Sequence, residues 1–206
     1  MADTKITELP TSTTPAKTST VPAVVSTTTS QVALSTIVRS TLGWFEVTDA
    51  ASTQTGIDDD TITKVQVDGS TTGVGGYDHL PHGILSASVY DSANDKVLLG
   101  WLTEGQSLMV QLHGDITTGT AITSATFTFK FFSSGDVEQT ALTRDFTVPY
   151  PVVGDYPFQV QTIVPITATL ASDGYCTVHV TFNGGSGADD SVIDMQSGSL
   201  MVSTLS

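Results

Sequence analysis

Positively charged residues are scarce in this chain. Only 7 of its 206 residues are Lys or Arg, against 21 Asp or Glu, and the formal net charge at pH 7 is −14. Binding to DNA or RNA needs clustered basic side chains that neutralise phosphates, and the sequence has no such cluster. We therefore expect no nucleic-acid partner and no anionic membrane partner. The acidic residues favour a solvated surface that keeps the protein soluble at high copy number, and complementarity to a basic partner is the alternative.

The chain contains a single cysteine, Cys176. One cysteine excludes an intramolecular disulfide and a CxxC metal pair. The alternating segment Tyr175–Val180 predicts a strand in which Cys176 is a small buried apolar residue. A catalytic pair with His179 is excluded by the spacing, because residues three apart on a strand point to opposite faces.

Long apolar runs are also absent. No segment reaches the length of about 20 apolar residues that crosses a bilayer. The N-terminus has no apolar run after Lys5 of the kind that follows the basic residues of a signal peptide. These absences predict a protein with no membrane partner that is made and assembled in a cytoplasm.

The composition favours β-structure. Charged residues make up only 14% of the chain, and Thr and Ser supply polarity instead. Thr is β-branched and suits the exposed face of a strand. The clearest strand is 121–132, where Phe127, Phe129 and Phe131 alternate with polar residues and are expected in the core. About eight short strands at near-regular spacing predict an all-β protein whose body is an antiparallel, jelly-roll-like β-sandwich.

Three regions are predicted along the chain. Residues 1–40 form an extended N-terminal attachment arm, because Pro10, Pro15 and Pro22 interrupt short apolar clusters that have no helical period. Residues 41–76 hold short strands and a Gly-rich connection, and residues 77–206 form the β-sandwich body. A long loop inside one domain is the alternative interpretation of 68–76. Because the arm cannot bury a face on itself, we expect it to lie along a partner.

The arm also resembles known proteins. It contains Lys5-Ile6-Thr7-Glu8-Leu9-Pro10, then Thr13-Thr14-Pro15, Val21-Pro22-Ala23-Val24-Val25 and Gln31-Val32-Ala33-Leu34-Ser35-Thr36-Ile37. This pattern resembles the opening of tailed-bacteriophage virion proteins, among them capsid decoration proteins, head fibres and some tail fibres. Thr7 stands where that pattern commonly has Ser, and residues 26–30 replace its Gly-rich turn.

The resemblance implies a structural protein of the virion. It implies a capsid decoration (cement) protein, a homotrimer that binds the major capsid protein on the outer capsid surface and stabilises the head. The alternative is a head fibre or short tail fibre whose C-terminal β-domain binds a host-cell glycan or receptor through loops such as 183–190. The expected contact residues are the apolar anchors of the arm, namely Ile6, Leu9, Pro10, Val21, Val24, Val25, Val32, Leu34 and Ile37.

Three clusters are candidates for cation binding. They are Asp58, Asp59 and Asp60; Asp189, Asp190 and Asp194; and Asp78, His79 and His82. The aspartates at 58–60 lack the glycine and distal glutamate of a dedicated calcium loop, and the histidines lack a further ligand at zinc-site spacing. Solvated loops, or a subunit contact for the histidines, are favoured, so no metal and no other cofactor is predicted. A bound cation is the alternative at each cluster.

No motif for catalysis is recognisable. The sequence has no GxSxG, P-loop or HExxH pattern. The two carboxylates of a glycosidase are brought together in space and leave no fixed spacing in a sequence. We therefore predict that the chain is not an enzyme, with a glycan-degrading enzyme as the open alternative. Trp44 and Trp101 are possible carbohydrate platforms, although burial is expected for Trp101.

Overall fold

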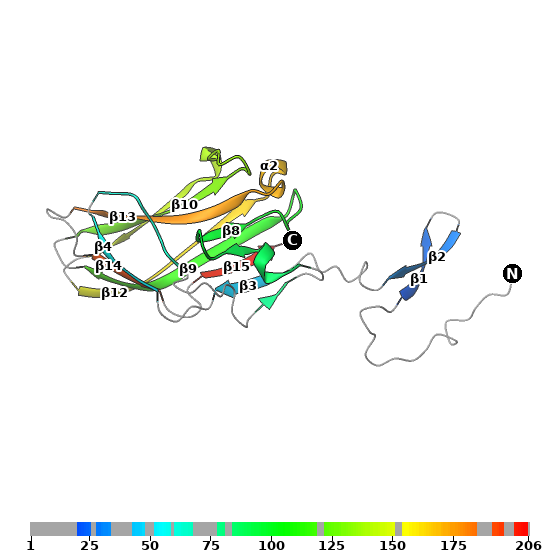
Figure 1. Ribbon diagram of the computed structural model, residues 1–206, viewed down its shortest axis with the longest axis horizontal. Helices are drawn as coiled ribbons and strands as arrows, with labels where there is room; N and C mark the ends of the chain where they lie inside the picture. Colours follow the sequence, from blue (N-terminus) through cyan, green and yellow to red (C-terminus); the bar gives the residue numbers. More distant parts are fainter. Residues whose placement is uncertain are drawn as a thin grey trace. The chain divides into compact units, whose positions relative to one another are not determined.

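The computed structural model describes residues 20–25, 28–33, 43–47, 52–58, 60–67, 78–80, 84–118, 122–150, 154–184, 191–195 and 200–205. The chain divides into two compact units, Met1–Ser40 and Thr41–Ser206. The first unit contains β1 (Thr20–Val25) and β2 (Thr28–Ala33), which pair antiparallel. The second unit, called the body below, contains the remaining described strands (Figure 1).

The larger sheet of the body has seven antiparallel strands. Its order is β4-β14-β9-β15-β3-β6, and β12 pairs with β9 over its whole length. The strands are β3 (Trp44–Val47), β4 (Ser52–Ile57), β6 (Asp78–His79), β9 (Ser107–Thr118), β12 (Gly154–Pro165), β14 (Ser191–Met195) and β15 (Leu200–Leu205). Because β14 and β15 follow one another along one edge of β9, β12 occupies the other edge and is an outermost strand of this sheet.

The smaller sheet has six antiparallel strands. Its order is β11-β10-β13-β8-β7, and β5 also pairs with β13. The strands are β5 (Thr63–Lys64), β7 (Tyr90–Asp91), β8 (Lys96–Leu98), β10 (Ser124–Phe132), β11 (Arg144–Pro149) and β13 (Tyr175–Asn183). The pairing of β10 with β13, from Ser124 opposite Asn183 to Phe132 opposite Tyr175, forms the centre of this sheet.

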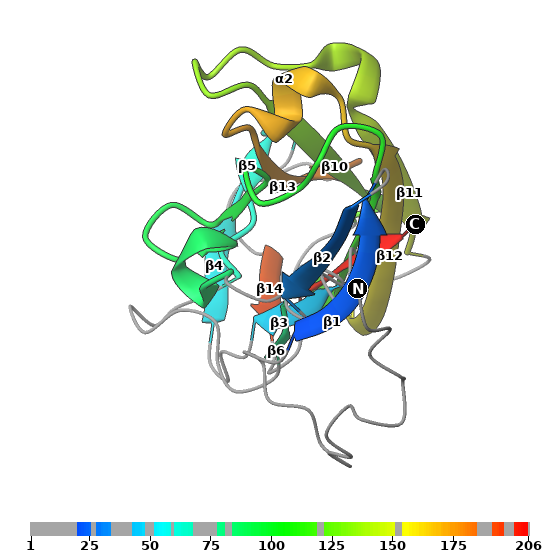
Figure 2. The same cartoon turned by 90° about the vertical axis from the view of Figure 1, so that its right-hand side faces the viewer.

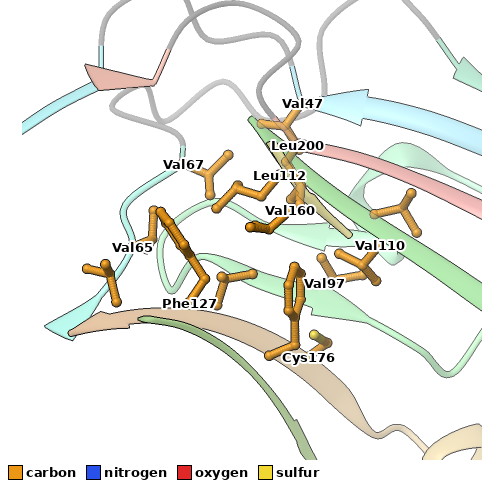
Figure 3. Close-up of a cluster of buried hydrophobic side chains, with 14 of the residues drawn as sticks. Val47, Val65, Val67, Val97, Val110, Leu112, Phe127, Val160, Cys176 and Leu200 are labelled. Atoms are coloured by element: carbon orange, nitrogen blue, oxygen red, sulfur yellow. The ribbon is translucent and has the colours of Figure 1, made fainter. Parts of the chain in front are cut away.

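The two sheets pack through one hydrophobic core. Along β9 and β12 every second side chain is buried, so each strand presents one face to the core and one to solvent. Figure 3 shows Leu112 and Val160 of the larger sheet opposite Phe127 and Cys176 of the smaller one. Such alternation is typical of sandwiches, whose inner faces interdigitate to form the core.

The all-β, antiparallel sandwich predicted from the sequence is confirmed. Phe127, Phe129 and Phe131 are fully buried, as expected from their alternation. Strands from the segment 41–76 belong to the sheets of the body, since β3 pairs with β15 and β4 with β14. The Gly-rich stretch 68–76 lies outside the described residues. In the part of the chain that the structure describes, no helix has the length and apolar character needed to cross a membrane.

Two strand predictions were wrong in their extent. The sequence of residues 84–90 predicts a strand, but residues Ser86–Ser88 form a 3-10 turn in which the Ser88 N–H donates to the Leu85 carbonyl (2.8 Å). The sequence of 158–170 predicts a strand pair or one long bent strand that is interrupted at Pro165. The interruption is confirmed, because β12 ends at Pro165, but the residues after it form α2 (Ala168–Ala171) and not a second strand. The Thr167 side chain accepts a hydrogen bond from the Leu170 N–H, which caps this short helix at its start.

Candidate functional site

The predicted contact residues of the arm fall partly in the described part of the first unit. Val21, Val24 and Val25 lie in β1 and Val32 lies in β2, where Val21 and Val32 are opposite one another in the register. The other predicted contacts are Ile6, Leu9, Pro10, Leu34 and Ile37, which lie outside the described residues. The structure therefore brings two of the anchors together, and their role in binding stays a prediction.

The β1–β2 hairpin leaves both of its outer edges without a further described strand. Pro22 lies in β1 opposite Gln31. Proline has no N–H to donate, so within a ladder it occupies positions whose N–H would point away from the partner strand. Its partner Gln31 therefore directs its backbone N–H and C=O to the open edge of β2. The same holds for Thr29 and Ala33, which lie two residues to either side of Gln31. A two-stranded ribbon is marginally stable in water, which makes this unit a candidate for pairing with another surface.

The acidic cluster Asp58–Asp60 lies in an exposed turn. Asp58 and Asp60 are exposed, and Asp59 lies outside the described residues. Asp60 adopts a left-handed backbone conformation (φ 55°), and its N–H donates to the Phe182 carbonyl at 2.8 Å. Asp tolerates this conformation better than most residues, which accounts for its place in the turn.

The other two clusters are only partly described. Asp194 is half-buried in β14 and accepts a hydrogen bond from Thr53 Oγ1 at 3.1 Å. His79 lies in β6 opposite Trp44, whereas His82, Asp189 and Asp190 lie outside the described residues. Among the residues that the structure describes, no group of three or more His, Cys, Asp or Glu side chains could hold a metal ion.

Cys176 and His179 are placed on opposite faces of β13, as the spacing predicts. Cys176 is fully buried, and desolvation raises the pKa of its thiol well above the usual range. His179 lies on the outer face, with its Nε2 3.0 Å from Thr177 Oγ1. Burial, together with the positive charges of Lys130 and Lys64, lowers the pKa of His179 to about 4. The imidazole is therefore neutral near pH 7, and no activated thiol exists here.

Trp101 lines a hollow of about 410 Å³ beside the end of α2. The indole is half-buried, donates from Nε1 to the Leu98 carbonyl at 2.8 Å and packs edge-on against Phe45 at 6.4 Å. Ser88 and Asp173 supply polar groups at the rim, and Asp173 is held at a positive φ of 59°. An aromatic side chain with a few convergent polar groups is the composition of many small-ligand sites.

Sequence reasoning singled out Trp101 but not its partners in this hollow. The local sequence Ser172-Asp173-Gly174 is a turn signal. That signal predicts a turn, but it does not predict that the turn lies beside a tryptophan that is distant in sequence. The outer-facing row Gln111, His113 and Asp115 on β9 was also missed, and it lines a second hollow of about 590 Å³ with Gln159 of β12.

Comparisons with known proteins give no family for this chain. No family model matches it, and no curated protein is significantly similar to it. The solved structures to which the chain is similar include Eiger TNF from S. frugiperda, with 10% identity, a TM-score of 0.43, and coverage of 79% of this chain and 89% of that one.

Two viral proteins are also among the similar structures. The enzymatically active domain of tailspike protein 4 of bacteriophage CBA120 has 9% identity and a TM-score of 0.34, and the match covers 81% of this chain but 20% of that one. A structure of infectious bursal disease virus Gt strain has 14% identity and a TM-score of 0.36, covering 95% of this chain and 41% of that one. The match therefore covers less than half of the length of both viral proteins.

Proposed function

We propose that this chain is a structural component of a tailed-phage virion and that it decorates the capsid. In this proposal residues 1–40 attach the protein to the major capsid protein, and the body covers the outer surface and stabilises the head. The observation that carries the proposal is the division of the chain into a small unit, whose described part is a two-stranded hairpin, and a body with its own extensive core. A unit of this kind gains stability by pairing with a partner surface.

The resemblance of the arm to phage virion proteins supports the same proposal, and so does the acidic composition. A protein present in many copies on one particle benefits from a net charge of −14, which disfavours self-precipitation. A homotrimer would present three arms at once, so that weak individual contacts sum through effective concentration. The body then needs no catalytic centre, and stability is its main requirement.

The test is a binding experiment with isolated phage particles. Purified full-length protein and a variant that lacks residues 1–40 are each mixed with isolated heads and, separately, with tails, and bound copies per particle are measured after sedimentation. We expect saturable binding to heads at hundreds of copies, and loss of that binding in the truncated protein. Retained head binding by the truncated protein, provided its far-UV circular dichroism still shows a folded body, would refute attachment through the arm.

The hollow at Trp101 favours a second candidate, a head fibre or short tail fibre that binds a host-cell glycan. Sugar rings stack on exposed faces of aromatic side chains and donate hydroxyl hydrogen bonds to carboxylates, and Trp101 with Asp173 offers both groups. The proposed glycan site is thus moved from the loop 183–190, most of which lies outside the described residues, to this hollow.

Quenching or a shift of tryptophan fluorescence on titration with host saccharides tests the second candidate. Asp173→Asn keeps the side-chain shape but removes the charge, and it should weaken saccharide binding about tenfold or more. Binding to tails, or to heads at only a few copies, would favour the fibre over the decoration protein. Saccharide binding that is unaffected by Asp173→Asn would place the glycan elsewhere.

A further inference from the structure

Among the strands that the structure describes, β12 pairs with β9 along one edge, and its other edge, called open below, has no paired strand. In its register with β9, the Ile166 N–H donates to the Gln106 carbonyl at 2.7 Å, and the Gly154 N–H donates to Thr118 Oγ1 at 3.1 Å. Even-numbered residues of this segment therefore direct their backbone groups towards β9. In an antiparallel ladder the alternate residues direct theirs the opposite way. The odd-numbered residues of β12 thus present N–H and C=O to the open edge.

Two prolines bound the usable part of this edge. Pro157 and Pro165 occupy odd positions, so neither offers an N–H there. Between them lie Gln159, Gln161 and Ile163, whose outward N–H and C=O groups have no backbone hydrogen-bond partner among the described residues. The segment Phe158–Val164, called the open window below, therefore offers three donors and three acceptors in a row.

Between its two flanking prolines, the open window has none of the usual protection of an edge strand. Natural edges are blunted by charged side chains, prolines or bulges, but the sequence of residues 158–164 contains no charged residue. The neighbouring outer strand β11 begins with Arg144 and Asp145, so its edge carries charge, and both edges lie on the same side of the sandwich (Figure 2). Ile163 is 53% exposed within the window. An uncharged, unpaired edge with an exposed apolar side chain is a template for strand addition.

We propose that β2 from a second copy of this chain adds to the open window of β12. The open edge of β2 offers the matching groups, since Thr29, Gln31 and Ala33 supply three N–H and three C=O groups at the same two-residue spacing. The edge of β1 is less suitable because Pro22 removes its central donor. With Gln31 opposite Gln161, every outward group of both segments finds a partner.

Charge and stability favour this occupant. Neither β2 nor the open window contains a charged residue, so the pairing brings no like charges together in a chain of net charge −14. The β1–β2 hairpin is only marginally stable by itself. Pairing with β12 would make it part of the larger sheet of the body, and sheets of three or more strands are more stable. The hollow beside Gln111, His113 and Gln159 lies on the same strand pair and leaves room for a side chain from the added strand.

This inference goes beyond the proposed function and is tested without virions. Gln31→Cys and Gln161→Cys are made as separate single variants of the full chain, mixed, and oxidised mildly. Paired residues of neighbouring strands have Cα atoms about 5.5 Å apart, which suits a disulfide. The native Cys176 is fully buried and does not compete. Thr147→Cys, exposed on the edge strand β11, is the matched control in place of Gln161→Cys.

We expect a disulfide-linked heterodimer from Gln31→Cys with Gln161→Cys, about tenfold more abundant than with the control, because strand pairing raises the effective concentration of the two thiols. Yields equal to the control would overturn the proposal. A dimer that Gln161→Cys forms with itself at higher yield would overturn it in favour of β12 pairing with β12. A double variant that carries both Gln31→Cys and Gln161→Cys tests which copy supplies β2. If it formed only an internal disulfide and no intermolecular product, β2 would come from the same chain, and the proposal of a second copy would be overturned.

A proline substitution gives an independent measurement. Gln161→Pro removes one outward N–H and leaves the ladder with β9 intact, as Pro157 and Pro165 already do, whereas Gln161→Thr keeps the N–H. The oligomer population measured by light scattering should fall several-fold in Gln161→Pro and remain unchanged in Gln161→Thr. Equal populations for the two variants would contradict pairing through this edge, even where both bodies are folded.

Discussion

Removal of the Phe127 ring tests how the two sheets are held together. Phe127 lies in β10, at the centre of the smaller sheet, and is 0% exposed. Its ring stacks on Phe158 of β12 with centroids 4.4 Å apart and an interplanar angle of 22°. Since β10 belongs to the smaller sheet and β12 to the larger one, this pair joins the two sheets directly. We therefore predict that Phe127→Ala is strongly destabilising.

The magnitude follows from burial and cavity formation. Truncation of a fully buried Phe to Ala costs about 3–5 kcal/mol, because transfer free energy is lost and the surrounding core relaxes only in part. The stacked arrangement places the expected loss in the upper half of that range, since an aromatic pair adds about 0.5–1.5 kcal/mol beyond its buried area. With a urea m-value of about 2 kcal/mol/M, a loss of about 4 kcal/mol lowers the unfolding midpoint by about 2 M.

Urea unfolding followed by tryptophan fluorescence measures this loss. Both tryptophans, Trp44 and Trp101, belong to the body, so the signal reports unfolding of the body and not of the N-terminal unit. The matched control is Phe132→Ala on the same strand, because Phe132 is half-buried and stacks on the outer face with Tyr175 at 4.9 Å. We expect the control to cost about 1–2 kcal/mol.

Equal losses for the two variants would refute the reasoning. The same holds for a loss below about 1 kcal/mol in Phe127→Ala, because a fully buried ring between two sheets cannot be removed so cheaply in a close-packed core. A changed m-value would mean that the compactness of the denatured or native state had changed, and the midpoints would then be compared only after that change is taken into account.

Three further predictions concern single residues. Gly174→Ala should destabilise the body by at least about 2 kcal/mol in urea unfolding, because an added Cβ would lie 2.8 Å from the Leu170 backbone. Gly135→Ala should be near neutral, because an added Cβ there makes an ordinary contact with Ser133 Oγ at 3.9 Å. The fold lowers the pKa of His179 to about 4, so on acidification the unfolded chain binds a proton at this residue before the folded protein does. The free energy of unfolding should therefore fall as the pH drops from about 6.5 towards 4. His179→Gln should make the urea midpoint depend less on pH over this range. Cys176 should not react with a thiol reagent in the native protein and should react at once in urea, and rapid native labelling would contradict its burial.

Much of the strand content could be predicted from local patterns. The alternation of Phe127, Phe129 and Phe131 identified a strand and its buried face, because side chains on a strand alternate with a period of two whatever their partners. The segment 84–90 and the part of 158–170 that follows Pro165 were misassigned, because short apolar runs fit a turn or a helix equally well. There local hydrogen bonds form the observed elements, from the Ser88 N–H to the Leu85 carbonyl and from the Leu170 N–H to the Thr167 side chain.

The candidate sites were less predictable than the strands. Trp101 could be identified as a candidate from its residue type alone. Asp173 could not, because it is the turn after α2 that places it in the same hollow. The sequence does not show that the backbone N–H groups of Gln159 and Gln161 are unpaired, because this depends on which strand pairs with which edge of β12. A sequence with regular alternation does not reveal whether a strand is central or outermost.

The sequence by itself determined the chemical character of this protein: few basic residues, one inert cysteine, an all-β body and a proline-interrupted N-terminal segment. These features depend on composition and on a period of two, which are local properties of the chain. Only the tertiary structure decided that β9 is flanked by β12 on one edge and by β14 and β15 on the other. The physical reason is that strand pairing joins residues far apart in sequence, so the open edge of β12 exists only once the whole sheet has formed.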